Sequence, residues 1–253
     1  MRITAQVGRA LGVTVEGFAA GRATAADIAE LKEAVYTNKI AVVKGQELTP
    51  RQFLALGRRL GRHADFHLPV YCQAGKFWHS NRHLTANPFD LSLSYPRAVP
   101  TYFIDMAAAY ERLPNDLKFE VRYATATYGV LRYAELGPRD KAQKLADIVE
   151  QVNARTPPVT GPAVSKHPHT GETVLHVSEG FTMALQDTDG ADRPDLLAAL
   201  LRETGQLDPT YQHENIHLQA FEQGDLLVWD NHSLVHRAAH NAAPEPVVSV
   251  YDE

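Results

Sequence analysis

Residues 223–236 read Gln223-Gly224-Asp225-Leu226-Leu227-Val228-Trp229-Asp230-Asn231-His232-Ser233-Leu234-Val235-His236. The pair Gly224-Asp225 is typical of a turn, and the apolar run 226–229 after it predicts a buried strand whose register the turn sets. Further short strands are predicted at 40–43, 173–177, 216–221 and 247–251. Short strands separated by turns, with helices in front of them, favour an α+β fold with a jelly-roll-like β core under flanking helices.

Helix signals precede and interrupt these strands. Thr24 suits the N-cap of a helix over 25–37, whose apolar residues recur at helical spacing. Thr49-Pro50 begins a second helix, and Gly61 is placed to end it. The remaining helical signals predict a helix at 106–113, a helical or mixed stretch over 116–152, and an inserted helix at 194–202.

Length and composition limit the class of protein. With 253 residues, 44% of them hydrophobic, the chain is long enough for one large core, and we expect a single domain over 1–253. A formal net charge of −5 does not indicate a basic surface, so nucleic acid and an anionic membrane are not expected as partners. The single cysteine, Cys72, excludes an internal disulfide, and neither a signal peptide nor a transmembrane helix is predicted. We therefore expect a cytoplasmic protein.

A metal site is suggested by His79-Ser80-Asn81 together with the distant His236. Two imidazoles and one further donor on one face of a metal suit a non-heme Fe(II) oxygenase with open coordination positions. On a strand, His79 and Asn81 would point to the same face because they are two residues apart. The chain has 12 histidines, so chance pairing is common and the spacing alone is weak evidence. His83 is expected to be structural, or else a substitute ligand or acid/base.

Several segments in the same order strengthen this interpretation. They are 10–18, 39–50, Phe77-Trp78-His79-Ser80-Asn81, 167–171 with 178–182, and 223–231 followed by His236. Over nearly its whole length the chain resembles the taurine dioxygenase family of Fe(II)/2-oxoglutarate-dependent oxygenases. The resemblance implies a distorted double-stranded β-helix and the cofactors Fe(II) and 2-oxoglutarate. It also implies oxidative decarboxylation of 2-oxoglutarate coupled to hydrogen abstraction from an unactivated C–H bond.

The resemblance also implies roles for individual residues. His79 and His236 would be the catalytic metal ligands, with Asn81 at the position of the third ligand. Thr101 lies where the family has a hydroxyl that contacts the co-substrate carboxylate. The family forms dimers or tetramers, so a homo-oligomer is expected.

Two departures from the family pattern bear on function. Asn81 stands where the family has an aspartate, and an amide oxygen is a neutral and weaker donor to iron than a carboxylate. The family's arginine that clamps 2-oxoglutarate falls at about Tyr251, and no arginine follows Arg237. Tyr251 offers a single hydroxyl to a co-substrate instead of a fork of donors. Together the two departures argue against an ordinary 2-oxoglutarate-dependent hydroxylase.

We predict a non-heme Fe(II)-dependent dioxygenase, an oxidoreductase linked to 2-oxoglutarate. Its substrate would be a small amino-acid-like or carboxylate metabolite of a biosynthetic pathway. A variant is an enzyme whose substrate ligates the iron and supplies the electrons itself. The alternative is a family member that has lost iron/2-oxoglutarate chemistry and serves as a binding protein or metal-independent enzyme.

Overall fold

The computed structural model describes residues 1–6, 11–63, 76–84, 87–95, 100–133, 143–239 and 247–251. Cys72 lies outside these ranges. The helices of the described chain are α1 (Ala25–Asn38), α2 (Pro50–Leu60), α3 (Met106–Arg112), α4 (Asn115–Val121), α5 (Leu145–Arg155) and α6 (Pro194–Glu203), with short 3₁₀ turns η1 (Asn81–Leu84) and η2 (Leu131–Tyr133).

Among the described residues, the largest sheet has seven strands and joins the N-terminal third to the C-terminal strands. Their order is β1 (Arg2–Ala5), β2 (Val13–Glu16), β3 (Ile40–Val43), β13 (Leu226–Asp230), β5 (Leu91–Ser94), β15 (Val247–Tyr251) and β4 (Arg62–His63). The central strand β13 runs antiparallel to β3 and β5, and all of its residues are buried. The predicted strand 226–229 is therefore the middle of this sheet.

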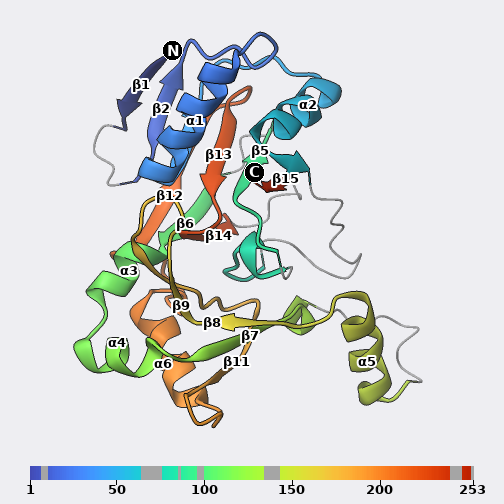
Figure 1. Cartoon of the computed structure of the whole chain (residues 1–253), viewed down its shortest axis with the longest axis vertical. Coiled ribbons are helices and arrows are strands. Elements are labelled where there is room, and N and C mark those ends of the chain that lie inside the picture. The colour runs from blue at the N-terminus through green and yellow to red at the C-terminus, as the bar shows by residue number, and fades with distance from the viewer. Residues whose placement is uncertain are drawn as a thin grey trace.

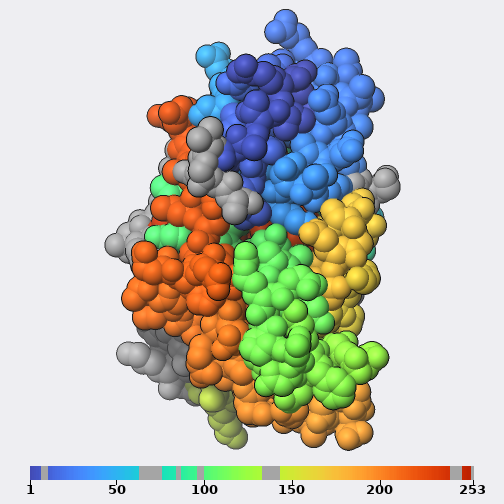
Figure 2. Space-filling model, turned by 90° about the vertical axis from the view of Figure 1, so that its left-hand side faces the viewer, coloured from blue at the N-terminus to red at the C-terminus, as the bar shows by residue number. Residues whose placement is uncertain are grey.

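Three smaller sheets complete the β structure of the described ranges. The first contains, in order, β12 (Ile216–Gln219), β6 (Thr101–Asp105) and β14 (Leu234–Ala238). The second contains β11 (Thr182–Gln186), β7 (Thr125–Tyr128) and β8 (Val159–Pro162). The third is the hairpin of β9 (Val164–Lys166) and β10 (Thr173–Leu175). Figure 1 shows the seven-stranded sheet with α1 and α2 in the upper half, and the remaining sheets with α3 to α6 below it. Figure 2 shows the β9–β10 segment (yellow) beside the segment that includes α3 (green), with the N-terminal part (blue) above both.

The two helices over the large sheet begin where the sequence predicts. Thr24 accepts from the backbone of Asp27, whose carboxylate bonds back to the N-cap, and Thr49 makes the same capping box with Gln52. Such reciprocal caps satisfy backbone N–H groups that the first helical turn leaves without partners. The helix starts at Thr24 and Thr49 are therefore confirmed.

The two faces of β13 belong to different apolar clusters. Leu226 and Val228 pack in the core beneath α1 and α2, while Leu227 and Trp229 pack on the other face with Phe103 of β6. Alternate side chains of a strand point to opposite faces, so β13 separates the helical layer from the layer between the two sheets. The second layer is where the candidate site is found.

The α+β fold with a jelly-roll core is confirmed. The strands predicted at 40–43 and 247–251 form with those bounds, the strand predicted at 226–229 runs over 226–230, and the inserted helix runs over 194–203. The strand predicted from 173 begins there and pairs with 164–166 in a hairpin. The mixed stretch contains α4, β7, η2 and α5. None of the helices in the described part of the chain is long and apolar enough to cross a membrane.

Candidate active site

Two histidines far apart in the sequence lie together on the inner side of β14. His79 and His236 form an isolated antiparallel bridge, in which each backbone N–H donates to the other residue's carbonyl oxygen, at 3.1 and 2.8 Å. Their ring centroids are 4.2 Å apart. His236 is in register with Phe103 of β6, which faces the layer between the sheets. The main chain therefore holds the two predicted ligand residues side by side.

The hydrogen bonds of His79 define its tautomer. Nδ1 lies 2.9 Å from the carbonyl oxygen of Phe77, and because a carbonyl only accepts, Nδ1 carries the proton and donates. Nε2 then carries the lone pair, the arrangement of a metal-binding histidine whose other nitrogen is fixed by a backbone carbonyl. Burial lowers the pKa of His79 to about 4, with a smaller effect from the nearby Arg237 charge. His79 is therefore neutral at pH 7.

His236 is also prepared as a neutral imidazole. Burial, and to a lesser degree His79, holds the pKa of His236 well below its usual range. Its Nδ1 is buried and has no hydrogen-bond partner among the described residues. A buried polar atom without a partner in a native structure calls for a missing water or ion. Two adjacent neutral imidazoles, one with such an atom, fit a first-row divalent metal.

Aromatic side chains enclose the histidine pair. Phe181 meets the ring of His79 edge-on at 5.5 Å, and Trp229 and Phe103 lie 5.1 and 5.9 Å from the ring of His236. These apolar neighbours remove water from both imidazoles, which is the physical cause of the lowered pKa values. They also form an apolar wall on which the hydrocarbon part of a small substrate could pack.

Asn81 does not lie on a strand, so the expectation that strand alternation aims it beside His79 is wrong. The chain turns into η1 at Asn81, and a 3₁₀ turn has no two-residue alternation. The buried amide donates to Ser92 Oγ at 3.0 Å and to Ser249 Oγ at 3.3 Å, and Ser92 also bonds Asn231. Asn81 therefore ties the segment after His79 to strands β5 and β15.

His83 lies buried in the same turn. Its ring stacks on Tyr128 at 4.2 Å and 10°, and its Nδ1 hydrogen-bonds with Ser178 Oγ at 3.2 Å. Nε2 is buried with no hydrogen-bond partner in the part of the chain that is described. Burial lowers its pKa to about 3, helped by Arg82. His83 is thus a buried, neutral imidazole in the turn that follows His79, and its role stays a prediction.

The two residues predicted to contact a co-substrate lie on different strands. Thr101 begins β6 two residues before Phe103, so the two side chains share a face of the strand. Tyr251 ends β15, and its ring lies 4.9 Å from Phe89 in a small apolar cluster that includes Phe181. Because Phe181 contacts His79, the Tyr251 cluster adjoins the histidine pair.

Two arginines approach this region. Arg237 follows His236 on β14, and its guanidinium lies 3.7 Å from the carboxylate of Glu179 and over the ring of Tyr211. Its side chain thus leaves the strand on the face opposite to His236. Arg62 pairs with Tyr251 across β4 and β15 and stacks over the tyrosine ring at 5.1 Å. Arg62 brings a positive charge to the strand position where the sequence has Tyr251.

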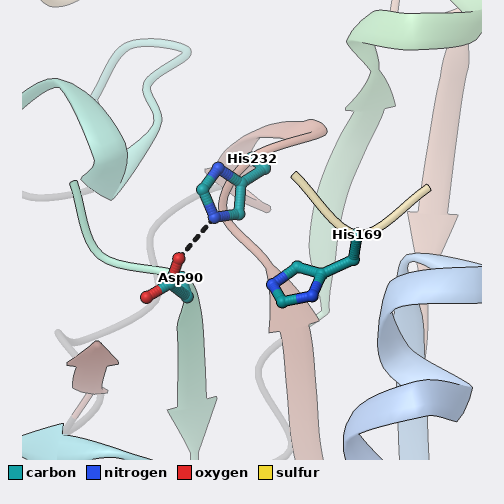
Figure 3. A group of neighbouring side chains, drawn as sticks. All are labelled: Asp90, His169 and His232. Atoms are coloured by element: carbon teal, nitrogen blue, oxygen red, sulfur yellow. Dashed lines mark hydrogen bonds and ion pairs between the residues drawn. The ribbon is translucent and has the colours of Figure 1, made fainter. Parts of the chain in front are cut away.

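A second group of donors was missed by sequence reasoning. Asp90, His169 and His232 lie together just before β5, in the β9–β10 turn and in the turn between β13 and β14 (Figure 3). No short motif links them, because Asp90 comes from the segment before β5 and the two histidines come from two different turns. His232 follows the end of the buried strand β13, and His169 lies in the turn before β10. These positions are the only signal that the sequence offers for the group.

A family model agrees with the motif resemblance. The model of "Taurine catabolism dioxygenase TauD, TfdA family" matches residues 3–248. The alpha-ketoglutarate-dependent 2,4-dichlorophenoxyacetate dioxygenase of Cupriavidus pinatubonensis is 31% identical over 170 residues, 65% of this chain and 54% of that protein. The match thus spans about half the length of that relative. Pentalenolactone F synthase of Streptomyces arenae is 26% identical over 100% of this chain and 96% of its own.

Solved structures agree on the fold. The crystal structure of AAD-2 in complex with Mn(II) and N-oxalylglycine has a TM-score of 0.78 at 21% identity, covering 99% of this chain and 97% of that one. A putative alpha-ketoglutarate-dependent taurine dioxygenase from Burkholderia xenovorans has a TM-score of 0.72 at 19% identity, covering 100% of this chain and 90% of its own. The resemblance drawn from the motifs is confirmed, and the chain belongs to the TauD/TfdA family.

Proposed function

We propose that this protein is an Fe(II)- and 2-oxoglutarate-dependent dioxygenase that acts on a small organic molecule. The observation that carries the proposal is the His79–His236 bridge, which sets two neutral imidazoles against each other inside the family's β core. Bound Fe(II) with 2-oxoglutarate would supply the oxidising power for the substrate, as in 2-oxoglutarate-dependent enzymes generally. The chain's residues supply binding, orientation and exclusion of water.

His79 and His236 are the proposed metal ligands. The Phe77 carbonyl keeps the His79 proton on Nδ1, so its Nε2 is presented to the metal. The backbone bridge between the two residues limits how far either ring can move. Because both pKa values are lowered, no proton competes with the metal near neutral pH.

Asn81 occupies the place of the third ligand in sequence, and its hydrogen bonds favour a supporting role. Its amide N–H groups are engaged with Ser92 and Ser249, so the residue offers at most its carbonyl oxygen to a metal. A set of two imidazoles and a neutral amide holds Fe(II) less tightly than two imidazoles and a carboxylate. We therefore expect measurable but weakened iron binding.

Thr101 and Tyr251 are the proposed contacts for the co-substrate. Thr101 shares a strand face with Phe103 at the site, and Tyr251 borders the Phe181 cluster against His79. Arg62, stacked on Tyr251, adds the positive charge that an anionic co-substrate needs. The aromatic side chains around the histidine pair favour a substrate with an apolar body. We expect the substrate also to carry a carboxylate or an amino-acid group.

Anaerobic titration of the metal-free protein tests this function. Fe(II) is added first and 2-oxoglutarate second, while the visible charge-transfer band of the ternary complex is followed. We expect the band in the wild type, its loss in His236→Ala, and its retention in the control His217→Ala, whose side chain bonds Gln219 on β12. A wild type that binds Fe(II) without the band would refute 2-oxoglutarate as co-substrate. A wild type that binds no Fe(II) would refute the iron site.

A further inference from the structure

We propose that Asp90, His169 and His232 form a second site, for a divalent transition-metal ion, separate from the His79–His236 pair. One donor atom from each of the three residues lies within 4.8 Å of the other two. Figure 3 shows Asp90 beside His232, with the ring of His169 turned toward both from the neighbouring turn. The three side chains come from the segment before β5 and from two different turns, and they converge on one point.

The chemistry of the donors selects the type of ion. Two imidazoles and one carboxylate suit Zn(II), Co(II) or Ni(II), whereas Ca(II) and Mg(II) prefer sets made only of oxygen. With metal bonds of about 2.1 Å, the ligands of a tetrahedral site are roughly 3.4 Å apart. Asp90 Oδ1 and His232 Nε2, which are 2.5 Å apart, would therefore separate by about an ångström around the ion, and the nitrogen of His169, within 4.8 Å of both, would adjust to them. His169 is exposed and Asp90 half-buried, so both can move and an ion can enter from solvent.

The surroundings hold the ligand-bearing turns in place. His167 donates from Nε2 to Asp230 at 2.9 Å and, through Nδ1, accepts the backbone N–H groups of His169 and Thr170 at 3.1 and 3.2 Å. The other oxygen of Asp230 accepts the backbone N–H of His232 at 2.8 Å. One buried carboxylate–imidazole pair therefore anchors the turns of both histidine ligands, as supporting shells of metal sites do.

The ring of His169 is also oriented. It stacks on Tyr36 of α1 with centroids 3.8 Å apart and planes 13° from parallel. This contact restricts the tilt of an otherwise exposed imidazole and leaves one of its ring nitrogens on the side of Asp90 and His232 (Figure 3). An ion at this site would tie the β9–β10 turn to the strand ends of the large sheet.

Arg82 is the competitor of the metal. The guanidinium of Arg82 can only donate, and it donates to Nδ1 of His232. The ring proton of His232 is therefore on Nε2, which donates a hydrogen bond to Asp90 Oδ1 at 2.5 Å. Metal binding through Nε2 requires that proton to move to Nδ1, where it would meet the Arg82 donors. The metal therefore displaces Arg82 from His232, and the repulsion between the two cations weakens binding.

The test is metal stoichiometry in tag-free protein, measured after dialysis against micromolar Zn(II). The variant His169→Phe keeps an aromatic ring for the stack on Tyr36 and removes the ligand nitrogen, and His217→Ala is the matched control. We expect His169→Phe to retain one equivalent of Zn(II) fewer than the wild type, and His217→Ala to match the wild type. Equal stoichiometry in the wild type and His169→Phe would overturn the site.

A second variant tests the competition with arginine. Arg82→Gln removes the cation and offers an amide oxygen to the Nδ1 proton that metal binding creates. We expect the Zn(II) dissociation constant of this site, measured against a chromophoric chelator, to fall about tenfold. A dissociation constant that stays the same or rises would show that Arg82 and the metal do not compete for His232. Neither measurement depends on iron or on turnover, so failure here leaves the proposed activity untouched.

Discussion

Replacing Asn81 by aspartate restores the carboxylate of the family and should make the protein depend on iron for its stability. In the metal-free protein, Asn81→Asp replaces an amide that donates to Ser92 and Ser249 with a carboxylate that can only accept. The two donated bonds are lost, and a serine hydroxyl can donate to the new carboxylate only by turning away from the network of Ser92, Ser249 and Asn231. At about 1 kcal/mol for each bond, the free energy of unfolding should fall by about 2 kcal/mol. For a chain of this size that lowers Tm by roughly 4–8 °C.

Iron should reverse this loss. A carboxylate in place of the amide is expected to tighten Fe(II) binding at least about tenfold, which adds about 1.4 kcal/mol to the iron-bound state. The rise in Tm on adding excess Fe(II) without oxygen should then be roughly 3–6 °C larger in Asn81→Asp than in the wild type. Differential scanning fluorimetry under anaerobic conditions measures both Tm values.

Asn231→Asp is the matched control. Asn231 belongs to the same network and donates to Ser92 Oγ at 2.8 Å. Unlike Asn81, it does not stand at the sequence position of the family's aspartate ligand. We expect Asn231→Asp to lower the Tm of the metal-free protein without enlarging the effect of iron. If Asn81→Asp shows the same iron-induced rise in Tm as the wild type, position 81 does not reach the metal and the ligand assignment is refuted.

Three further changes test the pH response, the co-substrate contact and a helix cap. Burial holds the pKa of His176 well below 6.5, so the unfolded chain takes up a proton there that the folded protein refuses, and stability falls as pH drops below 6.5. In His176→Gln, which can still bond Ser165, the free energy of unfolding measured with urea should fall less between pH 7 and pH 5 than in the wild type. An equal fall in both proteins would contradict this. Thr101→Val should raise the dissociation constant for 2-oxoglutarate about fivefold by equilibrium binding, through loss of one hydroxyl hydrogen bond, and an unchanged constant would remove Thr101 from the co-substrate site. Thr24→Ala should cost about 1 kcal/mol in chemical unfolding through loss of the α1 cap; no loss would mean that the cap is replaced by water.

The helix starts and the central strand could be predicted because their signals are local. Thr24 and Thr49 each lie three residues before the partner that completes a capping box, so the information is contained in a few neighbouring positions. The apolar run 226–229 is buried on both faces, which is what an uninterrupted hydrophobic strand requires. The family motifs around His79 and His236 pointed to the histidine pair for the same reason, since each motif is short.

Two features of the site depend on contacts between distant segments. The sequence placed Asn81 on a strand with His79, but packing against Ser92 and Ser249 favours a 3₁₀ turn that carries the amide into a buried polar network. Arg62 could not be assigned to Tyr251 without the pairing of β4 and β15. Strand register decides both contacts, and register is set by the pairing of whole strands.

By itself, then, the sequence determined the family, the helix starts, the central strand and the two imidazoles that the proposed iron site uses. Only the tertiary structure decided which of the 12 histidines join Asp90 in a second cluster, because His169 and His232 reach it from turns of different sheets. Local signals act over a few residues, where propensity and capping decide the outcome. A site assembled from separate turns exists only once the sheets have packed, since its geometry is the sum of many non-local contacts.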